Sequence, residues 1–155
     1  MSQNFTHRKA VLGDLEMIIQ LLIDDELGKT RETTTKQSDQ RYIDAFNKII
    51  ADPNQYLMVV EQNKEIVGTC HLTIMPSVTF IGSTRMQIEA VRVSSKFRSQ
   101  NIGTWMINAA IEYGRSQGAT IIQLTTNKKR LAAKKFYEDL DFKATHEGMK
   151  LYLDS

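Results

Sequence analysis

The chain has 155 residues, a formal net charge of +2, and hydrophobic residues at 41% of its positions. This length is typical of one domain with a sizeable core, and the composition excludes a disordered chain. The longest apolar runs are too short to span a membrane, and so small a charge gives no argument for a nucleic-acid partner. We therefore predict one soluble domain over residues 1–155.

The N-terminus and the cysteine content indicate the compartment. The first ten residues lack the apolar core of a secretion signal, so we expect a cytoplasmic protein. The lone cysteine, Cys70, fits that compartment, and we interpret it as a small buried hydrophobe rather than a nucleophile. The histidines His7, His71 and His146 show no ligand spacing and have no cysteine pair near them, so we predict no metal site.

The first half of the chain predicts a strand, two helices and a hairpin. A strand at 5–10 is followed by apolar residues at 12, 15, 18, 19, 22 and 23, which have the helical period. A polar, threonine-rich stretch at 28–37 is expected to be a loop. The next helix has apolar positions at 42, 45, 46, 49 and 50, with Ser38 as its candidate cap and Pro53 beyond its end. Strands at 56–60 and 66–74 flank a polar turn and form a hairpin that ends before Pro76.

The second half continues with alternating elements. A strand at 86–93 leads into a helix, which ends at Gly118, and a short apolar strand follows at 121–124. The predicted inner face of this helix is Ile102, Trp105, Met106, Ala109, Ala110 and Tyr113. A helix at 131–140 presents Ala133, Phe136, Tyr137 and Leu140 on one side, and a closing strand is expected at 149–153. The strand-helix-strand crossover at 86–125 requires a parallel pair, so we predict a mixed sheet.

Residues 86–113 place a carboxylate next to a site for an anion. A β-branched strand that carries Glu89 runs through a short basic loop directly into an amphipathic helix. The start of a helix offers unpaired N–H groups and the positive end of the helix dipole. Gly103 lets the backbone come close to a bulky phosphate. We therefore predict a phosphate site adjoining a potential base.

The basic loop is neither of the two common nucleotide-binding loops. It lacks the Gly-Lys-Ser/Thr ending of a nucleotide triphosphatase and the triple glycine of a dinucleotide site. Its sequence is RSQNIG at 98–103, and VRV at 91–93 precedes it. Further along the chain come Asn127 and the run AKKFYEDLDF at 133–142.

With these motifs the chain resembles the GCN5-related N-acetyltransferase (GNAT) superfamily. The resemblance follows the element order of nearly the whole chain, and its specific part is residues 86–142. The family loop has Arg or Gln, two residues, Gly, one residue, and Gly or Ala. Arg98 and Gly103 match this pattern, whereas Asn101 replaces the first glycine. Because Asn readily adopts a left-handed conformation, we expect the loop to keep its shape.

The resemblance implies an α/β fold. Its sheet would be mixed, mostly antiparallel, flanked by helices on both faces, and splayed between the fourth and fifth strands. The family's usual Leu-Gly-Phe is LDF at 140–142 in this chain. Asp141 can take the place of that glycine as a residue of a helix-ending turn.

The resemblance also implies acetyl-coenzyme A (acetyl-CoA) as the acetyl donor, without a metal. Its pyrophosphate would rest on backbone N–H groups of residues 99–104, and its pantetheine arm would pair with the backbone of Val91 and Val93. Asn127 would bond the pantetheine, or it would be a plain turn residue, and both readings stay open. The implied cofactor-binding residues are Val91, Arg92, Val93, Arg98, Ser99, Gln100, Asn101, Ile102, Gly103, Thr104 and Asn127.

Glu89 is the candidate base. An amine substrate arrives mostly as ammonium, which must lose a proton before it can attack. Strand alternation points Glu89 away from the side of Ile88 and Ala90. The superfamily often has its base at this place, so we interpret Glu89 as the base rather than as a solvated strand carboxylate. A backbone N–H near Val91 would stabilise the oxyanion.

Tyr137 is the candidate acid. It matches the family position that protonates the leaving thiolate, and transfer from a phenol of pKa ~10 to a thiolate of pKa ~8.5 is only a small uphill step. The alternative is a ring that packs beside Phe136, and we predict the acid on the resemblance. His146 or a water relay is the alternative to Glu89 as base, although an exposed loop histidine is the simpler expectation.

The sequence therefore predicts an N-acetyltransferase that moves acetyl from acetyl-CoA to a primary amine by direct attack. The acceptor is unidentified: a small metabolite is favoured, and a protein acceptor stays open, as does a homodimer. We expect neither membrane nor nucleic acid as a partner. The alternative function is a non-catalytic acetyl-CoA sensor or basic binding module. The basic cluster at 128–135 supports it, although those residues could instead hold the cofactor phosphates or form a solvated helix start.

Overall fold

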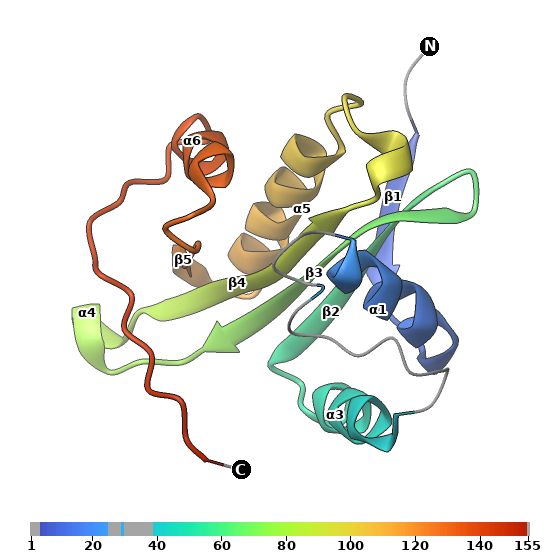
Figure 1. The fold of residues 1–155 in the computed structure, drawn as a ribbon. Coiled ribbons are helices and arrows are strands. Elements are labelled where there is room, and N and C mark those ends of the chain that lie inside the picture. Colours follow the sequence, from blue (N-terminus) through green and yellow to red (C-terminus); the bar gives the residue numbers. More distant parts are fainter. Residues whose placement is uncertain (1–3, 25–28, 30–38, 155) are drawn as a thin grey trace. The chain divides into compact units, whose positions relative to one another are not determined.

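The computed structural model describes residues 4–24, 29 and 39–154 (Figure 1). The chain forms two compact units, residues 1–123 and 124–155. The first unit contains the sheet, whose strand order is β1-β2-β3-β4-β5. Strands β1 to β4 pair antiparallel, and β4 and β5 are parallel, so the predicted mixed, mostly antiparallel sheet is confirmed.

The N-terminal elements follow the prediction closely. Strand β1 spans Phe5–Lys9, a short 3-10 turn η1 spans Leu12–Asp14, and helix α1 spans Leu15–Ile23. The Asp14 carboxylate accepts hydrogen bonds from the Val11 N–H at 2.8 Å and from the Arg8 guanidinium at 2.7 and 3.0 Å. One buried carboxylate thus ties the first strand to the start of the first helix.

Helix α3, Gln40–Ala51, begins one residue later than its predicted cap implied. Its N-cap is Asp39, whose carboxylate accepts a hydrogen bond from the Arg41 N–H at 3.0 Å. Asp and Ser satisfy a helix start in the same way, so the sequence pattern does not separate them. Ser38 lies outside the described residues, as does the loop predicted at 28–37 except for Lys29.

The predicted hairpin is confirmed and is longer than expected. Strand β2, Gln55–Gln62, pairs with β3, Glu65–Met75, across the two-residue turn Asn63-Lys64. Both turn residues have positive φ, 50° and 66°. That is the conformation of a type I′ turn, which suits the twist of two antiparallel strands.

After the hairpin, a short connection leads to the central strand. The turn α4, Thr79–Gly82, contains two residues with left-handed backbone, Phe80 and Ile81. Strand β4, Thr84–Val93, follows, and then a 3-10 turn η2, Ser95–Phe97. Helix α5, Ile102–Ser116, ends just before Gly118, which has φ +82°, and strand β5 spans Ala119–Leu124.

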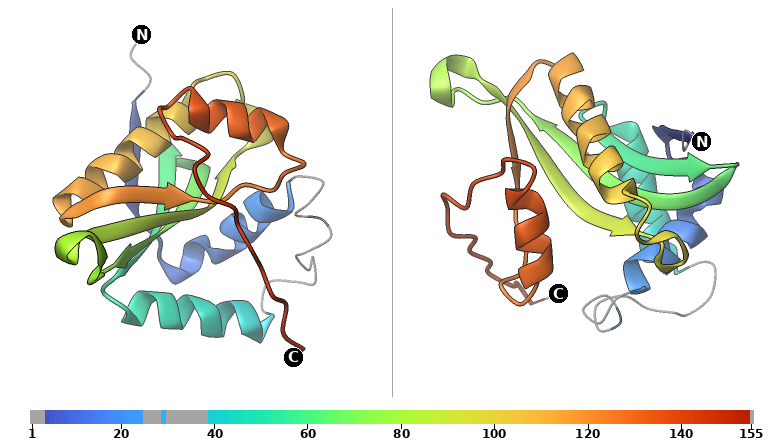
Figure 2. Two further views of the ribbon diagram at one scale, coloured as in Figure 1. Left: turned by 90° about the vertical axis from the view of Figure 1, so that its left-hand side faces the viewer. Right: turned by 90° about the horizontal axis from the view of Figure 1, so that it is seen from above.

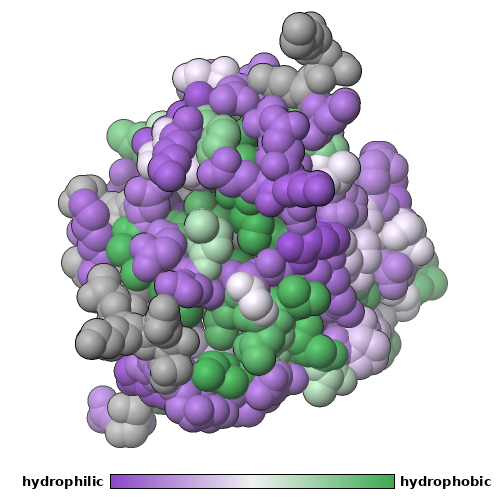
Figure 3. Space-filling model, turned by 90° about the vertical axis from the view of Figure 1, so that its right-hand side faces the viewer, coloured by the Kyte–Doolittle hydropathy of each residue, from purple (hydrophilic) through white to green (hydrophobic). Residues whose placement is uncertain are grey.

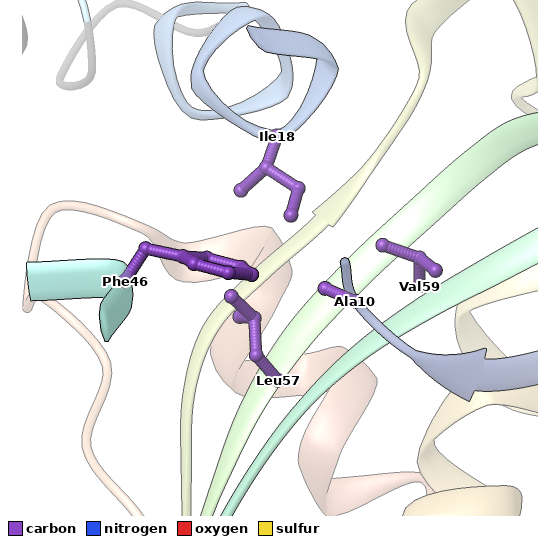
Figure 4. Packing of buried hydrophobic residues seen from close by; sticks show 5 residues of the cluster. All are labelled: Ala10, Ile18, Phe46, Leu57 and Val59. Carbon is purple, nitrogen blue, oxygen red and sulfur yellow. The ribbon is translucent and has the colours of Figure 1, made fainter. Parts of the chain in front are cut away.

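Helices cover the two faces of the sheet in the first unit (Figure 1). Helices α1 and α3 pack on one face, where Ala10, Ile18, Phe46, Leu57 and Val59 form a buried cluster (Figure 4). Helix α5 packs on the other face and buries Ile102, Met106, Ile107, Ala110 and Gly114. Ile107 and Gly114 were not among the residues predicted for its inner face, and a Cβ on Gly114 would meet side-chain atoms of Ile122 and Met86 at 2.9 and 3.0 Å.

The outer surface of α1 and α3 mixes apolar and polar side chains (Figure 3). Val11, Met17 and Ile50 are exposed apolar residues near or on these helices, at 58%, 44% and 42%. These are single residues at element ends and on outer helix faces, which is ordinary for a globular protein. Among the described residues, no helix is long and apolar enough to cross a membrane.

The second unit contains helix α6, Leu131–Glu138, and an extended C-terminal segment (Figure 2). The four residues predicted for one side of this helix and its end, Ala133, Phe136, Tyr137 and Leu140, are each half-buried, as expected. The closing strand predicted at 149–153 is wrong, because the structure forms no strand there. Met149, Leu151, Tyr152 and Leu153 are 83–92% exposed, and an extended segment becomes a strand only when a neighbour supplies hydrogen bonds.

Candidate active site

Glu89 lies on β4 beside a β-bulge. In the pairing with β3, His71 faces Glu89 and Thr69 faces Arg92, so the single residue Cys70 faces two residues of β4. Ala90 in this bulge has φ +52°. Ile88 is buried and Glu89 exposed, as strand alternation predicted, but the exposed Ala90 breaks the alternation. A bulge takes backbone groups out of the ladder and redirects them, which is common next to functional sites.

His71 is the neighbour of Glu89 that the sequence reasoning missed. Its imidazole Nε2 lies 2.7 Å from the Gln55 side-chain oxygen, and the Thr73 hydroxyl donates to the same oxygen at 2.9 Å. Burial lowers the pKa of His71, and the charge of Glu89 opposes that shift. The alternation of Thr69, His71 and Thr73 with apolar residues could have indicated a polar strand face, but not the pairing with Glu89.

The basic loop after β4 is anchored at its start. The Ser94 N–H donates to the Val67 carbonyl at 2.8 Å, and the Ser95 N–H donates to the Asp24 carboxylate at 3.1 Å. The loop therefore leaves the sheet from a position fixed by β3 and by the end of α1. Arg98 and Ser99, which follow, are exposed.

Two left-handed residues shape the loop before α5. Asn101, the N-cap of α5, has φ 60° and ψ 24°, which confirms the conformation expected for the residue that replaces the family glycine. Ser99 also has positive φ, 70°, which was not predicted. The first hydrogen bond of the helix runs from the Trp105 N–H to the Asn101 carbonyl at 3.0 Å. The N–H groups of residues 102–104 come before it, and groups at that position have no acceptor within the helix.

The strand residues predicted to meet the cofactor lie between the bulge and the loop. Val91, Arg92 and Val93 are all half-buried, and Arg92 donates to the Val91 carbonyl at 2.8 Å. Gln123 of β5 donates to the Gln87 side-chain oxygen at 2.8 Å, and β5 ends one residue later. Because β4 runs on to Val93, its last residues continue past the point where β5 ends.

In the second unit, Asn127 is a turn residue. Its side-chain oxygen accepts a hydrogen bond from the Lys129 N–H at 2.9 Å, and its carbonyl accepts from the Arg130 N–H at 2.8 Å. This is an Asx turn that leads into α6. The structure thus shows the turn role, and the contact with pantetheine stays a prediction.

Tyr137 is held within an aromatic group on α6. Its ring centroid lies 5.1 Å from that of Phe136 and 5.8 Å from that of Phe142, both in edge-to-face contact. The alternative reading of Tyr137, a ring that packs beside Phe136, is therefore seen in the structure. The acid role of Tyr137 stays a prediction.

Helix α6 ends in a Schellman motif. The Phe142 N–H donates to the Tyr137 carbonyl and the Asp141 N–H donates to the Glu138 carbonyl, both at 3.0 Å. Asp141 has φ 68°, the left-handed conformation that such a helix end requires. The expectation that Asp141 replaces a glycine in a helix-ending turn is confirmed. The Tyr137–Phe142 ring contact is the hydrophobic contact typical of this motif.

The basic cluster at 128–135 is largely paired with acids of its own unit. Lys128 lies 3.6 Å from Glu147, Lys134 lies 3.7 Å from Glu138, and Lys135 lies 2.9 Å from Asp139. Each of these exposed ion pairs contributes little to the stability of the fold. Together they reduce the local positive charge. His146 is exposed and contacts Thr145 at 2.6 Å, which matches the simpler expectation for it.

Two remaining predictions concern the thiol and a metal. Cys70 is fully buried, and burial raises the pKa of its thiol to about 12, so the interpretation as a small hydrophobe rather than a nucleophile is supported. Within residues 4–24, 29 and 39–154, no three His, Cys, Asp or Glu side chains gather as metal ligands would.

Comparison with known proteins assigns the chain to a family. The model of the Acetyltransferase (GNAT) family matches residues 16–142, which include β4, the basic loop and α6. The chain belongs to the GNAT family. It is therefore an acyltransferase, as the motifs predicted.

Two relatives that are named as N-acetyltransferases agree with this assignment. Aminoalkylphosphonate N-acetyltransferase of Salmonella typhimurium is 31% identical over 110 residues, 69% of each chain. Glucosamine 6-phosphate N-acetyltransferase of Trypanosoma brucei brucei is 35% identical over 88 residues, 57% of this chain and 58% of the relative. A crystal structure of a transcriptional regulator from Bacillus halodurans is 43% identical, with a TM-score of 0.93, covering 97% of this chain and all of that one.

Proposed function

We propose that the protein transfers acetyl from acetyl-CoA to the primary amine of a small molecule. The observation that carries this proposal is the junction in the first unit, where an exposed carboxylate, a β-bulge and a helix start follow one another along the chain. The two curated relatives named above act, by their names, on small amines that carry a phosphonate or a phosphate. They support a small molecule over a protein as acceptor.

The chain can hold the donor at the start of α5. Ser99 and Asn101 have left-handed backbone, and loops that contain such residues can form concave arrangements of N–H groups that bind phosphate. Exposed Arg98 adds a positive charge. The half-buried backbone of Val91 and Val93, beyond the end of β5, would pair with the extended pantetheine arm.

Acetyl-CoA supplies a thioester carbonyl, and the residues of this chain act around it. Glu89 removes a proton from the ammonium, so that the nitrogen keeps the electron pair for a direct attack. A backbone N–H at the bulge near Val91 stabilises the negative charge that develops on the carbonyl oxygen. Tyr137 donates its hydroxyl proton to the departing thiolate. No acyl-enzyme is needed, and buried Cys70 is unsuited to form one.

A second candidate function is a non-catalytic acetyl-CoA sensor or basic binding module. The similarity to a transcriptional regulator from Bacillus halodurans favours it. The internal pairing of Lys128, Lys134 and Lys135 counts against a basic surface for nucleic acid. Release of free thiol from acetyl-CoA in the presence of a panel of amines separates the two, because a sensor releases none.

We also propose a single domain, a cytoplasmic location and a homodimer. The family match crosses the boundary between the two units, which supports one domain. A lone buried thiol suits a reducing compartment. A homodimer would cover the exposed apolar side chains at the α4 turn, Val78, Phe80 and Ile81. A measurement of the molar mass in solution tests the proposed homodimer.

Glu89→Gln tests the base. The amide keeps the shape and deletes the basic oxygen, so the rate at neutral pH should fall by about a hundredfold. It should recover as rising pH deprotonates the amine in solution. Rates measured from pH 6 to about pH 10, at saturating acetyl-CoA, provide the comparison. A pH–rate profile for Glu89→Gln that overlays the parent profile would show that Glu89 is not the base. His146 or a water molecule would then be the candidate base.

A further inference from the structure

A row of polar side chains crosses one face of the sheet beside Glu89. Strand pairing and side-chain hydrogen bonds place its members on four adjacent strands: Gln55 on β2, His71 and Thr73 on β3, Gln87 and Glu89 on β4, and Gln123 on β5. Apolar residues alternate with them and face α5. A row of this kind is costly on a sheet face unless its groups are hydrogen-bonded or have a function.

Hydrogen bonding fixes the form of the His71 ring. The Gln55 side-chain oxygen can only accept, and it receives the Thr73 hydroxyl at 2.9 Å as well as His71 Nε2 at 2.7 Å. The Nε2 atom of neutral His71 must therefore carry the hydrogen. Its other nitrogen, Nδ1, then has the lone pair and is the atom that can accept a proton.

The charge that acts on His71 comes from Glu89. The two residues face each other directly across β3 and β4, an arrangement that brings Cβ atoms to within ~4.5–5.5 Å. From β2, the uncharged Gln55 meets the ring. Helix α1 packs on the same strands and carries Glu16, which is exposed, and Asp24, which is bound to the Ser95 N–H. Burial keeps His71 neutral at pH 7 by lowering its pKa, with the Glu89 charge opposing.

We propose that His71 is a positioning residue that receives, through Nδ1, the proton that Glu89 removes from the amine. The proposal rests on the proposed acetyl transfer. In the first step an ammonium N–H bond breaks, its electron pair stays on nitrogen, and an O–H bond forms on Glu89. In the second step that O–H bond breaks and an Nδ1–H bond forms on His71, directly or through one water molecule. Glu89 returns to its carboxylate form, and the imidazolium is stabilised beside it.

The pH dependence of turnover tests this role. His71→Gln keeps a donor for the Gln55 oxygen and removes the titratable nitrogen. In the parent, kcat/KM should fall at a pH below the usual titration range of histidine, as His71 becomes protonated before reaction. In His71→Gln the rate at pH 7 should fall about tenfold or more. The acidic limb of its pH–rate profile should move to lower pH. His7→Gln is the matched control, because His7 faces α5 on the other side of the sheet and contacts Tyr56 and Trp105.

An NMR titration of the histidine rings gives a readout without turnover. In the parent, His71 should be the Nε2–H tautomer and should titrate at lower pH than an ordinary histidine, because burial lowers its pKa. In Glu89→Gln it should titrate at still lower pH, because the carboxylate that favours the imidazolium is gone. Identical pH profiles for parent and His71→Gln, an Nδ1–H tautomer, or a His71 titration insensitive to Glu89→Gln would each overturn the proposal. Absence of turnover in the parent with every amine would instead overturn the proposed function.

Discussion

Tyr137 differs from a phenylalanine by one hydroxyl, and its ring is already held by Phe136 and Phe142. Tyr137→Phe should therefore leave the packing of α6 intact while removing the proposed proton donor. We expect turnover to fall by about a hundredfold or more, with little change in the affinity for coenzyme A. Steady-state rates and calorimetric titration with coenzyme A measure the two effects.

The matched control is Tyr152→Phe in the same unit, whose ring is 83% exposed. It should keep the parent rate. If Tyr137→Phe also keeps that rate, its hydroxyl has no part in catalysis and the ring serves the end of α6 only.

At the level of single residues, the sequence predicted a backbone conformation correctly where the residue type itself favours that conformation. Asn101 and Asp141 were expected to replace glycines because their side chains tolerate a left-handed backbone, and both have positive φ. His71 was missed because its significance depends on a partner. The strand β3 alone does not reveal which residue of β4 faces it, since the register follows from the length of the connection at 76–83 and from the bulge.

Among the elements, the turn from β4 into α5 offers the sharpest test of donor binding. Gly103→Val places a branched side chain on the first turn of α5, where the proposed phosphate contacts lie. Loss of one charge-assisted hydrogen bond is worth about 1.5–3 kcal/mol, so coenzyme A should bind about tenfold more weakly or worse. Calorimetry measures the affinity, and circular dichroism shows whether the variant is folded.

A substitution on the outer side of the same helix serves as the comparison. Asn108 is exposed on α5, and Asn108→Ala should leave the affinity for coenzyme A unchanged. If the folded Gly103→Val variant binds coenzyme A with the parental affinity, the start of α5 is not part of the donor site.

The elements themselves were predicted well where a local pattern determines them. The hairpin follows from two strand-like runs separated by a short polar turn, and α5 follows from its apolar period and the glycine after it. The strand predicted at 149–153 is wrong because a local pattern is not enough to form it. Its alternating Met149, Leu151 and Leu153 satisfy the local pattern of a strand, but a strand forms only with a neighbour, and sequence alone does not supply one.

For the molecule as a whole, the order of the strands follows from simple connections. Each strand from β1 to β5 lies next to its neighbour in the sequence, and the one helical crossover, through α5, joins the one parallel pair. The fold class was therefore accessible from the sequence. The contacts that join distant segments were not accessible from the sequence, and the ion pair of Arg8 with Glu61 is one of them.

Asp14 links the pH to the stability of the whole fold. Hydrogen bonds from Arg8, and a further one from the Val11 N–H, hold the pKa of its carboxyl below the usual value despite burial. An unfolded Asp has a pKa of ~3.9, so the stabilisation is complete above about pH 4 and is lost as the pH falls through the lower pKa of the folded state. Asp14→Asn keeps an acceptor for Val11 and removes the charge. It should lower the free energy of unfolding by about 2 kcal/mol at pH 7.

Urea unfolding of parent and variant at pH 7 and at about pH 3 measures this contribution and its pH dependence. The difference between the two proteins should be largest at pH 7 and should shrink at the lower pH, because Asp14 of the unfolded parent binds a proton there, which favours the unfolded state. Asp44→Asn is the control, since Asp44 is exposed on α3 and bonds only the Gln40 side chain within the described contacts. It should change the stability by less than about 0.5 kcal/mol. An equal difference for Asp14→Asn at both pH values would show that the geometry of the cap, and not the charge, joins β1 to α1.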